Sequence, residues 1–131
     1  MAQTNKILIV DDELSLVQLC QLVLEGAGYQ VRGAASGREA LRLIMEEIPD
    51  LILLDVMMPG MDGIEVCRQI RSQFTASRPF ILMYTADDRD KTRDSSFKAG
   101  ANALLTKDTP VFELPSKISS YLVGAFTSIV I

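Results

Sequence analysis

The sequence contains no histidine among its 131 residues, and it contains only two cysteines. The absence of histidine removes the most common general base, the most common zinc ligand and any phosphohistidine on this chain. Cys20 and Cys67 both lie in apolar helical patterns, where cysteine usually behaves as a small buried hydrophobe. We therefore expect two buried thiols and no disulfide.

The chain also lacks an excess of basic residues. Its formal net charge is −4, its pI is near 4.8, and its lysines and arginines are scattered among acidic residues. Neutralising the phosphates of a nucleic acid requires clustered positive charge, so direct nucleic-acid binding is not expected. An anion handled by this chain must be met locally, with the help of a cation.

Long hydrophobic runs are missing as well. The apolar run that precedes Asp11 has only four residues, Ile7–Val10, which is too few for the core of a signal peptide, and we expect a cytoplasmic protein. Residues 118–131 carry no charge, but this stretch is shorter than the roughly 20 residues that span a bilayer, so no membrane insertion is expected. An uncharged tail is expected to be buried against another protein surface. Residues 125–131 are therefore interpreted as an added edge strand, a contact in a homodimer, or the remnant of a longer chain.

Apolar runs and helical periodicities alternate along the chain, which predicts repeated strand–helix units. The expected strands are Ile7–Val10, Tyr29–Val31, Leu51–Leu54, Phe80–Tyr84 and Ala103–Leu105. The first, third and fourth are apolar without alternation, as strands covered on both faces require. Right-handed crossovers then favour an α/β, doubly wound, five-stranded parallel sheet of flavodoxin-like order 2-1-3-4-5. We expect one domain over residues 1–124, followed by the tail.

Several helix boundaries are also predicted. Ser36 and Glu39 form a capping box at the start of the second helix. Asp87 or Asp88 is expected to cap a charged fourth helix, and the regular part of the last helix is expected to begin at Pro115.

Polar residues follow four of these strands. Asp11 and Asp12 follow the first strand, Asp55 the third, Thr85 the fourth and Lys107 the fifth. The carboxyl ends of parallel strands meet at one edge of the sheet, where α/β proteins bind their ligands. In the predicted strand order, Asp11 and Asp12 should lie about 5 Å from Asp55. The joint placement predicts a site that none of these residues would indicate alone.

The expected chemistry of this site is phosphoryl binding. Closely spaced carboxylates stay ionised when a cation lies between them, and Mg²⁺ suits carboxylates, waters and a phosphate oxygen. A backbone carbonyl after Asp55 would complete the ion's coordination. Asp55 ends the central strand, between the acids on one side and Thr85 and Lys107 on the other. Asp55 is therefore the expected nucleophile, forming an aspartyl-phosphate.

Six segments form a set that resembles the receiver domain of two-component response regulators. They are Ile7–Glu13, Leu51–Asp55, Met58–Gly63, Thr85–Ala86, Gly100–Asn102 and Thr106–Lys107, within a match over residues 6 to 123. The resemblance implies that a histidine kinase or phosphotransfer protein phosphorylates Asp55. It also implies that Asp12, Asp55 and the carbonyl of Met57 bind Mg²⁺ directly, and that Asp11 binds it through water. Lys107 would then pair with the phosphoryl oxygens, and Thr85 would move toward them as a switch.

Two positions depart from the family pattern. Asp108 follows Lys107 where relatives usually have a proline with a cis peptide bond, and we expect a trans bond here, because a cis bond before a non-proline residue costs about 2.5–4 kcal/mol. Leu104 occupies the usual aromatic switch position, so coupling of Thr85 to a swinging ring is not expected in its common form.

The leading hypothesis is a phosphoacceptor switch that catalyses only its own phosphorylation and dephosphorylation, and is not a turnover enzyme. A Mg²⁺-dependent phosphatase of the haloacid-dehalogenase kind is one alternative, although that family has Asp-x-Asp where this chain has adjacent aspartates. A second alternative is a pseudo-receiver that binds partners without phosphorylation, which Asp108 and Leu104 motivate.

Overall fold

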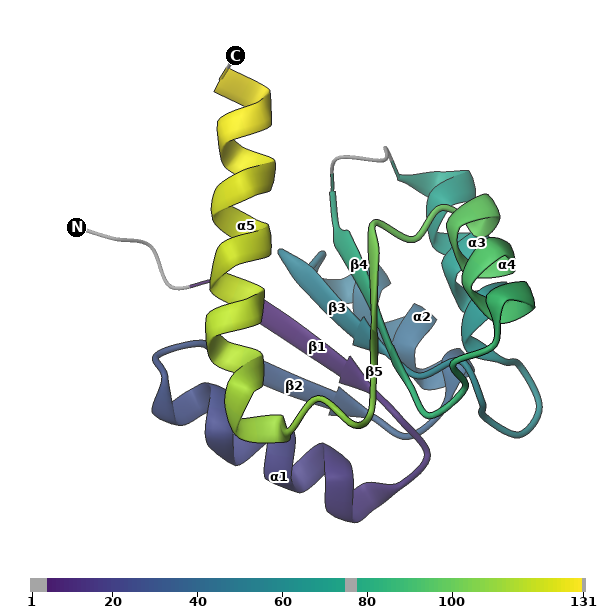
Figure 1. Ribbon diagram of the computed structural model, residues 1–131, viewed down its shortest axis with the longest axis horizontal. Helices are drawn as coiled ribbons and strands as arrows, with labels where there is room; N and C mark the ends of the chain where they lie inside the picture. Colours follow the sequence, from purple (N-terminus) through teal and green to yellow (C-terminus); the bar gives the residue numbers. More distant parts are fainter. Residues whose placement is uncertain (1–4, 75–77, 131) are drawn as a thin grey trace.

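The computed structural model describes residues 5–74 and 78–130, and for residues 125–130 it describes the backbone alone. Strands and helices alternate along the chain as the sequence predicts (Figure 1). In chain order the elements are β1 (Lys6–Val10), α1 (Leu14–Gly26), β2 (Gln30–Ala34), α2 (Gly37–Glu46), β3 (Leu51–Leu54), α3 (Gly63–Gln73), β4 (Phe80–Thr85), α4 (Asp90–Ala99), β5 (Ala103–Thr106), a 3₁₀ turn η1 (Val111–Glu113) and α5 (Leu114–Val130).

The five strands form one sheet of order β2-β1-β3-β4-β5, and each neighbouring pair is parallel. This confirms the predicted doubly wound fold. Helices α1 and α5 cover one face of the sheet, and α2, α3 and α4 cover the other (Figure 1). All four residues of β3 are buried, as an apolar central strand between two helical layers requires.

Local sequence signals set several helix ends. The Ser36 hydroxyl accepts a hydrogen bond from the backbone N–H of Glu39, and the Glu39 carboxylate accepts one from the N–H of Ala35, so the capping interaction is confirmed. Helix α4 ends at Gly100, whose φ of 111° lies in the left-handed region that favours glycine. Cys20 and Cys67 are both buried free thiols in the described part of the chain.

Strand β2 is longer than the sequence pattern suggested. It continues past Val31 to Ala34 and pairs with β1 along all of β1. The apolar run that predicted this strand ends at Val31 because Arg32 and Gly33 follow it. A Cβ atom at Gly33 would lie 2.6 Å from Cγ1 of Val17, so the missing side chain lets α1 pack directly on the strand.

Two other expectations need correction. Helix α4 begins at Asp90 after Arg89, so neither Asp87 nor Asp88 is its N-cap. The tail does not form an added strand, because the helical backbone of α5 continues through residues 125–130. Leu114 and Ile118 are fully buried and stabilise the first turns of α5, and extending an existing helix costs far less than starting a new element. Among the described residues, no helix is long and apolar enough to cross a membrane.

Candidate functional site

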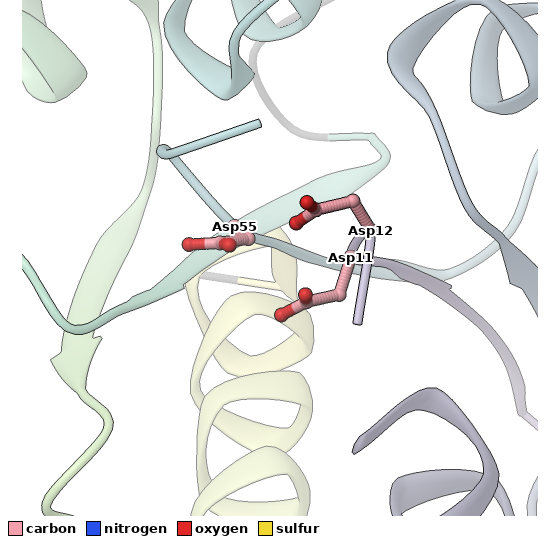
Figure 2. A group of neighbouring side chains, drawn as sticks. All are labelled: Asp11, Asp12 and Asp55. Carbon is pink, nitrogen blue, oxygen red and sulfur yellow. The ribbon is translucent and has the colours of Figure 1, made fainter. Parts of the chain in front are cut away.

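Three carboxylates meet at the carboxyl edge of the sheet (Figure 2). Asp11 and Asp12 follow β1, Asp55 follows β3, and these two strands are direct neighbours in register. One oxygen from each of the three residues lies within 4.8 Å of the others, which agrees with the predicted spacing. Asp11 and Asp55 are buried, whereas Asp12 is exposed. The cluster is therefore open to solvent on the side of Asp12.

Lys107 reaches this cluster from the loop after β5. Its Nζ donates a hydrogen bond to Oδ2 of Asp11 at 2.7 Å and lies 3.4 Å from Oδ2 of Asp55. The other oxygen of Asp11 accepts a hydrogen bond from the backbone N–H of Glu13 at 2.9 Å. Asp11 is thus held from two sides, and the ammonium of Lys107 lies between the two buried carboxylates.

Burial and charge act together on these groups. Burial, followed by the nearby charge of Asp11, raises the pKa of Asp55, while Lys107 and the N–H of Met57 oppose this rise. Burial alone would lower the pKa of Lys107, but its hydrogen bond to Asp11 and the charges of Asp55 and Asp11 raise it overall. Lys107 therefore stays protonated near neutral pH, yet a single ammonium facing a group of carboxylates leaves an excess of negative charge.

The fourth strand contributes Thr85 and the loop after it. Thr85 is fully buried, and its hydroxyl accepts a hydrogen bond from the backbone N–H of Asp87 at 3.1 Å. The Asp87 carboxylate accepts hydrogen bonds from the Arg89 guanidinium and backbone N–H and from the Thr92 hydroxyl. These bonds hold the pKa of Asp87 well below its usual range. Thr85 is therefore linked through Asp87 to the first turn of α4.

The loop after β3 contributes a backbone contact to Asp55. The backbone N–H of Met57 donates a hydrogen bond to Oδ1 of Asp55 at 3.3 Å, while Met57 itself is 58% exposed. The N–H of Gly63 donates to the carbonyl of Val56 at 2.9 Å, which fastens the start of α3 to this loop. The loop backbone is thereby fixed beside the Asp55 carboxylate.

One contact at the site was not predicted from the sequence. Tyr84 is buried next to Thr85, and its hydroxyl donates a hydrogen bond to the carbonyl of Thr109 at 2.6 Å. A signal was present, because a phenol inside an apolar strand needs a polar partner when it is buried. The peptide bond between Lys107 and Asp108 is trans, as expected. Leu104 is buried at the position where family members usually have an aromatic residue.

The donor set fits a hard divalent cation. It consists of carboxylate oxygens alone, within reach of one another and with an excess of negative charge, and Mg²⁺ prefers oxygen ligands and keeps several waters. The exposed side of the cluster leaves room for such waters. Asp11, Asp12 and Asp55 are the residues that would hold the ion.

Comparisons with known proteins agree with this geometry. The family model described as "Response regulator receiver domain" matches residues 7–119. The alkaline phosphatase synthesis transcriptional regulatory protein PhoP of Bacillus subtilis (strain 168) is 44% identical over 118 residues, which are 90% of this chain and 48% of that protein. The chain thus spans about half the length of this relative.

Solved structures show the same fold. A CheY-like response regulator receiver domain protein from Methanospirillum hungatei JF-1 superposes with a TM-score of 0.89 at 28% identity, covering 96% of this chain and 99% of that one. The BeF3-activated N-terminal receiver domain of RstA from Klebsiella pneumoniae gives a TM-score of 0.82 at 33% identity, covering 90% of this chain and 98% of that one. These findings do not favour the phosphatase or the pseudo-receiver alternative. The chain belongs to the family of receiver domains of two-component response regulators.

Proposed function

We propose that Asp55 is the phosphoacceptor of this receiver domain. In the transfer, an Asp55 carboxylate oxygen attacks the phosphorus of the donor, a new O–P bond forms, and the bond to the leaving group breaks. With acetyl phosphate as the donor, acetate departs with the electron pair of the broken P–O bond. The observation that carries the proposal is the position of Lys107, whose Nζ lies 3.4 Å from Asp55 and so is poised beside an incoming phosphoryl group.

Lys107 changes partners in this proposal. It is now hydrogen-bonded to Asp11 and lies close to Asp55. A phosphoryl group on Asp55 would bring oxygens that carry more negative charge than the carboxylate, and the ammonium would donate to them. Lys107 needs to move only within the cluster, because it already contacts both acids.

Asp11, Asp12 and Asp55, together with the carbonyl of Met57, are proposed to hold Mg²⁺. When bound, Mg²⁺ would neutralise negative charge on the acids and on the phosphoryl oxygens. The support from this chain is the spacing of the carboxylates and the fixed loop at Met57. Thr85 is proposed to donate its hydroxyl to a phosphoryl oxygen, which would withdraw it from the N–H of Asp87.

The donor is proposed to be a histidine kinase or a phosphotransfer protein, and the domain is proposed to act in the cytoplasm. The chain would catalyse only its own phosphorylation and dephosphorylation and would act as a switch for partner binding. A receiver domain over residues 1–124 and a role of residues 125–131 in a homodimer remain predictions, as does the interpretation of these residues as the remnant of a longer chain.

The test uses acetyl phosphate and Mg²⁺ with no partner protein. Intact mass spectrometry is expected to show one added phosphoryl group that is stable in acid and lost in base. Asp55→Asn should stay unmodified, and removal of Mg²⁺ with a chelator should abolish labelling of the wild type. An unmodified wild type, or an equally modified Asp55→Asn, would contradict the proposal.

A further inference from the structure

We propose that Tyr84 is a positioning residue for the phosphoryl transfer, because its hydroxyl holds the turn that carries Lys107. The inference rests on the proposed function, in which Lys107 stabilises the phosphoryl group on Asp55. It concerns a side chain outside the acid cluster whose hydroxyl bonds to the backbone of the loop after β5.

The first observation is the burial of the phenol. Tyr84 is 3% exposed and packs in the core between the sheet and helices α1 and α5. Its hydroxyl donates to the carbonyl of Thr109 at 2.6 Å, which lies within the usual range of O–H···O hydrogen bonds. A buried hydroxyl without a partner is costly, so this bond fixes the carbonyl of Thr109 relative to the end of β4.

The second observation is the turn itself. The N–H of Thr109 donates to the carbonyl of Thr106 at 3.0 Å, which makes residues 106–109 a four-residue turn with Lys107 as its second residue. The N–H of Lys107 donates to the carbonyl of Thr85 at 2.8 Å, at the end of β4. Thr106, the first residue of the turn, belongs to β5, so the bond from Tyr84 holds the opposite end.

The third observation is how the rest of the turn is held. Asp108 follows Lys107, so the turn lacks the ring of a proline, which would fix one backbone dihedral angle there. The Thr106 hydroxyl and the Asp108 carboxylate are hydrogen-bonded to each other, which joins two residues of the same turn but does not anchor the turn to the core. Tyr84 provides a side-chain anchor from the core.

The expected consequence is kinetic. Without the Tyr84 hydroxyl, the Thr109 end of the turn can shift, and the Lys107 ammonium loses its fixed place beside Asp55. Displacements of about 1 Å at a reacting centre can reduce rates by up to about a hundredfold, and a flexible lysine recovers part of this loss. We therefore expect Tyr84→Phe to slow phosphorylation roughly tenfold at saturating donor, with little change in the donor concentration for half-maximal rate.

The experiment is a double-mutant cycle with acetyl phosphate and Mg²⁺. Initial phosphorylation rates are measured for the wild type, Tyr84→Phe, Lys107→Ala and the double variant. If Tyr84 acts through Lys107, the Tyr84→Phe change should cost less than about twofold in the Lys107→Ala background. Tyr121→Phe is the matched control, because Tyr121 packs against the same core and stacks on Phe80. It should react as the wild type does.

The outcomes separate this inference from the proposed function. If the wild type is not phosphorylated, the proposed function fails, and the inference fails with it. If the wild type reacts and Tyr84→Phe reacts equally fast, or the slowing is the same with and without Lys107, only the positioning role is overturned. A Tyr84→Phe protein that does not fold, judged by circular dichroism, also overturns it, because Tyr84 would then support the core in general.

Discussion

A methyl group at position 63 would test how closely α3 approaches the backbone that carries Asp55. A Cβ atom built on Gly63 lies 2.0 Å from the carbonyl oxygen of Asp55, 2.8 Å from its carbonyl carbon and 2.9 Å from Cα of Val56. All three are backbone atoms, so none can rotate away. To reach ordinary van der Waals contact, the nearest pair must separate by about 1.4 Å.

This displacement sets the expected magnitude. Overpacking a tight core typically costs 1–3 kcal/mol, and a clash with backbone belongs at the upper end, so we expect Gly63→Ala to lower the free energy of unfolding by about 3 kcal/mol. For a domain of this size, that corresponds to a fall in Tm of about 10 °C. Asp55 should also be displaced from Lys107, and labelling by acetyl phosphate should slow.

Gly26→Ala is the matched control. A Cβ atom at Gly26 meets nothing within 4 Å, and this glycine is the last residue of α1. The same substitution there should leave stability unchanged or raise it by up to about 1 kcal/mol, because alanine restricts the unfolded chain. Urea unfolding followed by circular dichroism measures both variants. If Gly63→Ala were as stable as Gly26→Ala, the close approach of α3 to Asp55 would be refuted.

Three further predictions follow from charge and burial. Without Mg²⁺, Asp12→Asn should relieve repulsion in the acid cluster and raise the free energy of unfolding by an amount on the order of 1 kcal/mol. The same variant should bind Mg²⁺ more weakly in a calorimetric titration. A variant less stable than the wild type would contradict this prediction. Burial raises the pKa of the Cys20 and Cys67 thiols to about 11. The stabilisation of the folded state by the two protonated thiols should therefore be complete below their unfolded pKa of about 8.5, and it should be lost as the pH rises toward 11. Urea midpoints at pH 7 and pH 10 should therefore differ more for the wild type than for a variant with both cysteines changed to alanine, and an equal difference would refute the assignment. Asp87→Ala removes the acceptor of the Arg89 N–H and the Thr92 hydroxyl, so amide hydrogen exchange in the first turn of α4 should speed up, whereas unchanged exchange would show that these bonds do not hold the helix.

Much of the architecture was predictable because its signals are local. The uninterrupted apolar residues of β1 and β3 predict a parallel sheet covered on both faces, and the handedness of the crossovers then sets the strand order. The strand order in turn brings Asp11 and Asp12 beside Asp55. Each of these steps depends on residue type and spacing, which the sequence displays directly.

The predictions of the end of β2 and of the C-terminal tail were wrong because tertiary contacts decide the structure there. Gly33 looks like the end of a strand, but it is the place where Val17 of α1 packs on β2. The β-branched residues near the end of the chain suggest a strand, whereas the helix started by Leu114 and Ile118 continues through them.

The contacts at the site were also predictable where they depend on strand ends and not where they depend on the path of a loop. The convergence of the acids with Lys107 could be predicted because all of them follow strands. The bond from Tyr84 to Thr109 could not, because it joins residues 25 positions apart through a loop whose path no sequence pattern specifies.

A crystal structure of this chain with Mg²⁺ and fluoroberyllate, a mimic of the phosphoryl group, would test directly whether Asp55 accepts a phosphoryl group. We expect beryllium to bind the carboxylate of Asp55, the metal to lie among Asp11, Asp12 and Asp55, and Nζ of Lys107 to donate to a fluorine. A fluoroberyllate bound elsewhere, or a Lys107 that remains on Asp11 and out of reach of the ligand, would contradict this expectation.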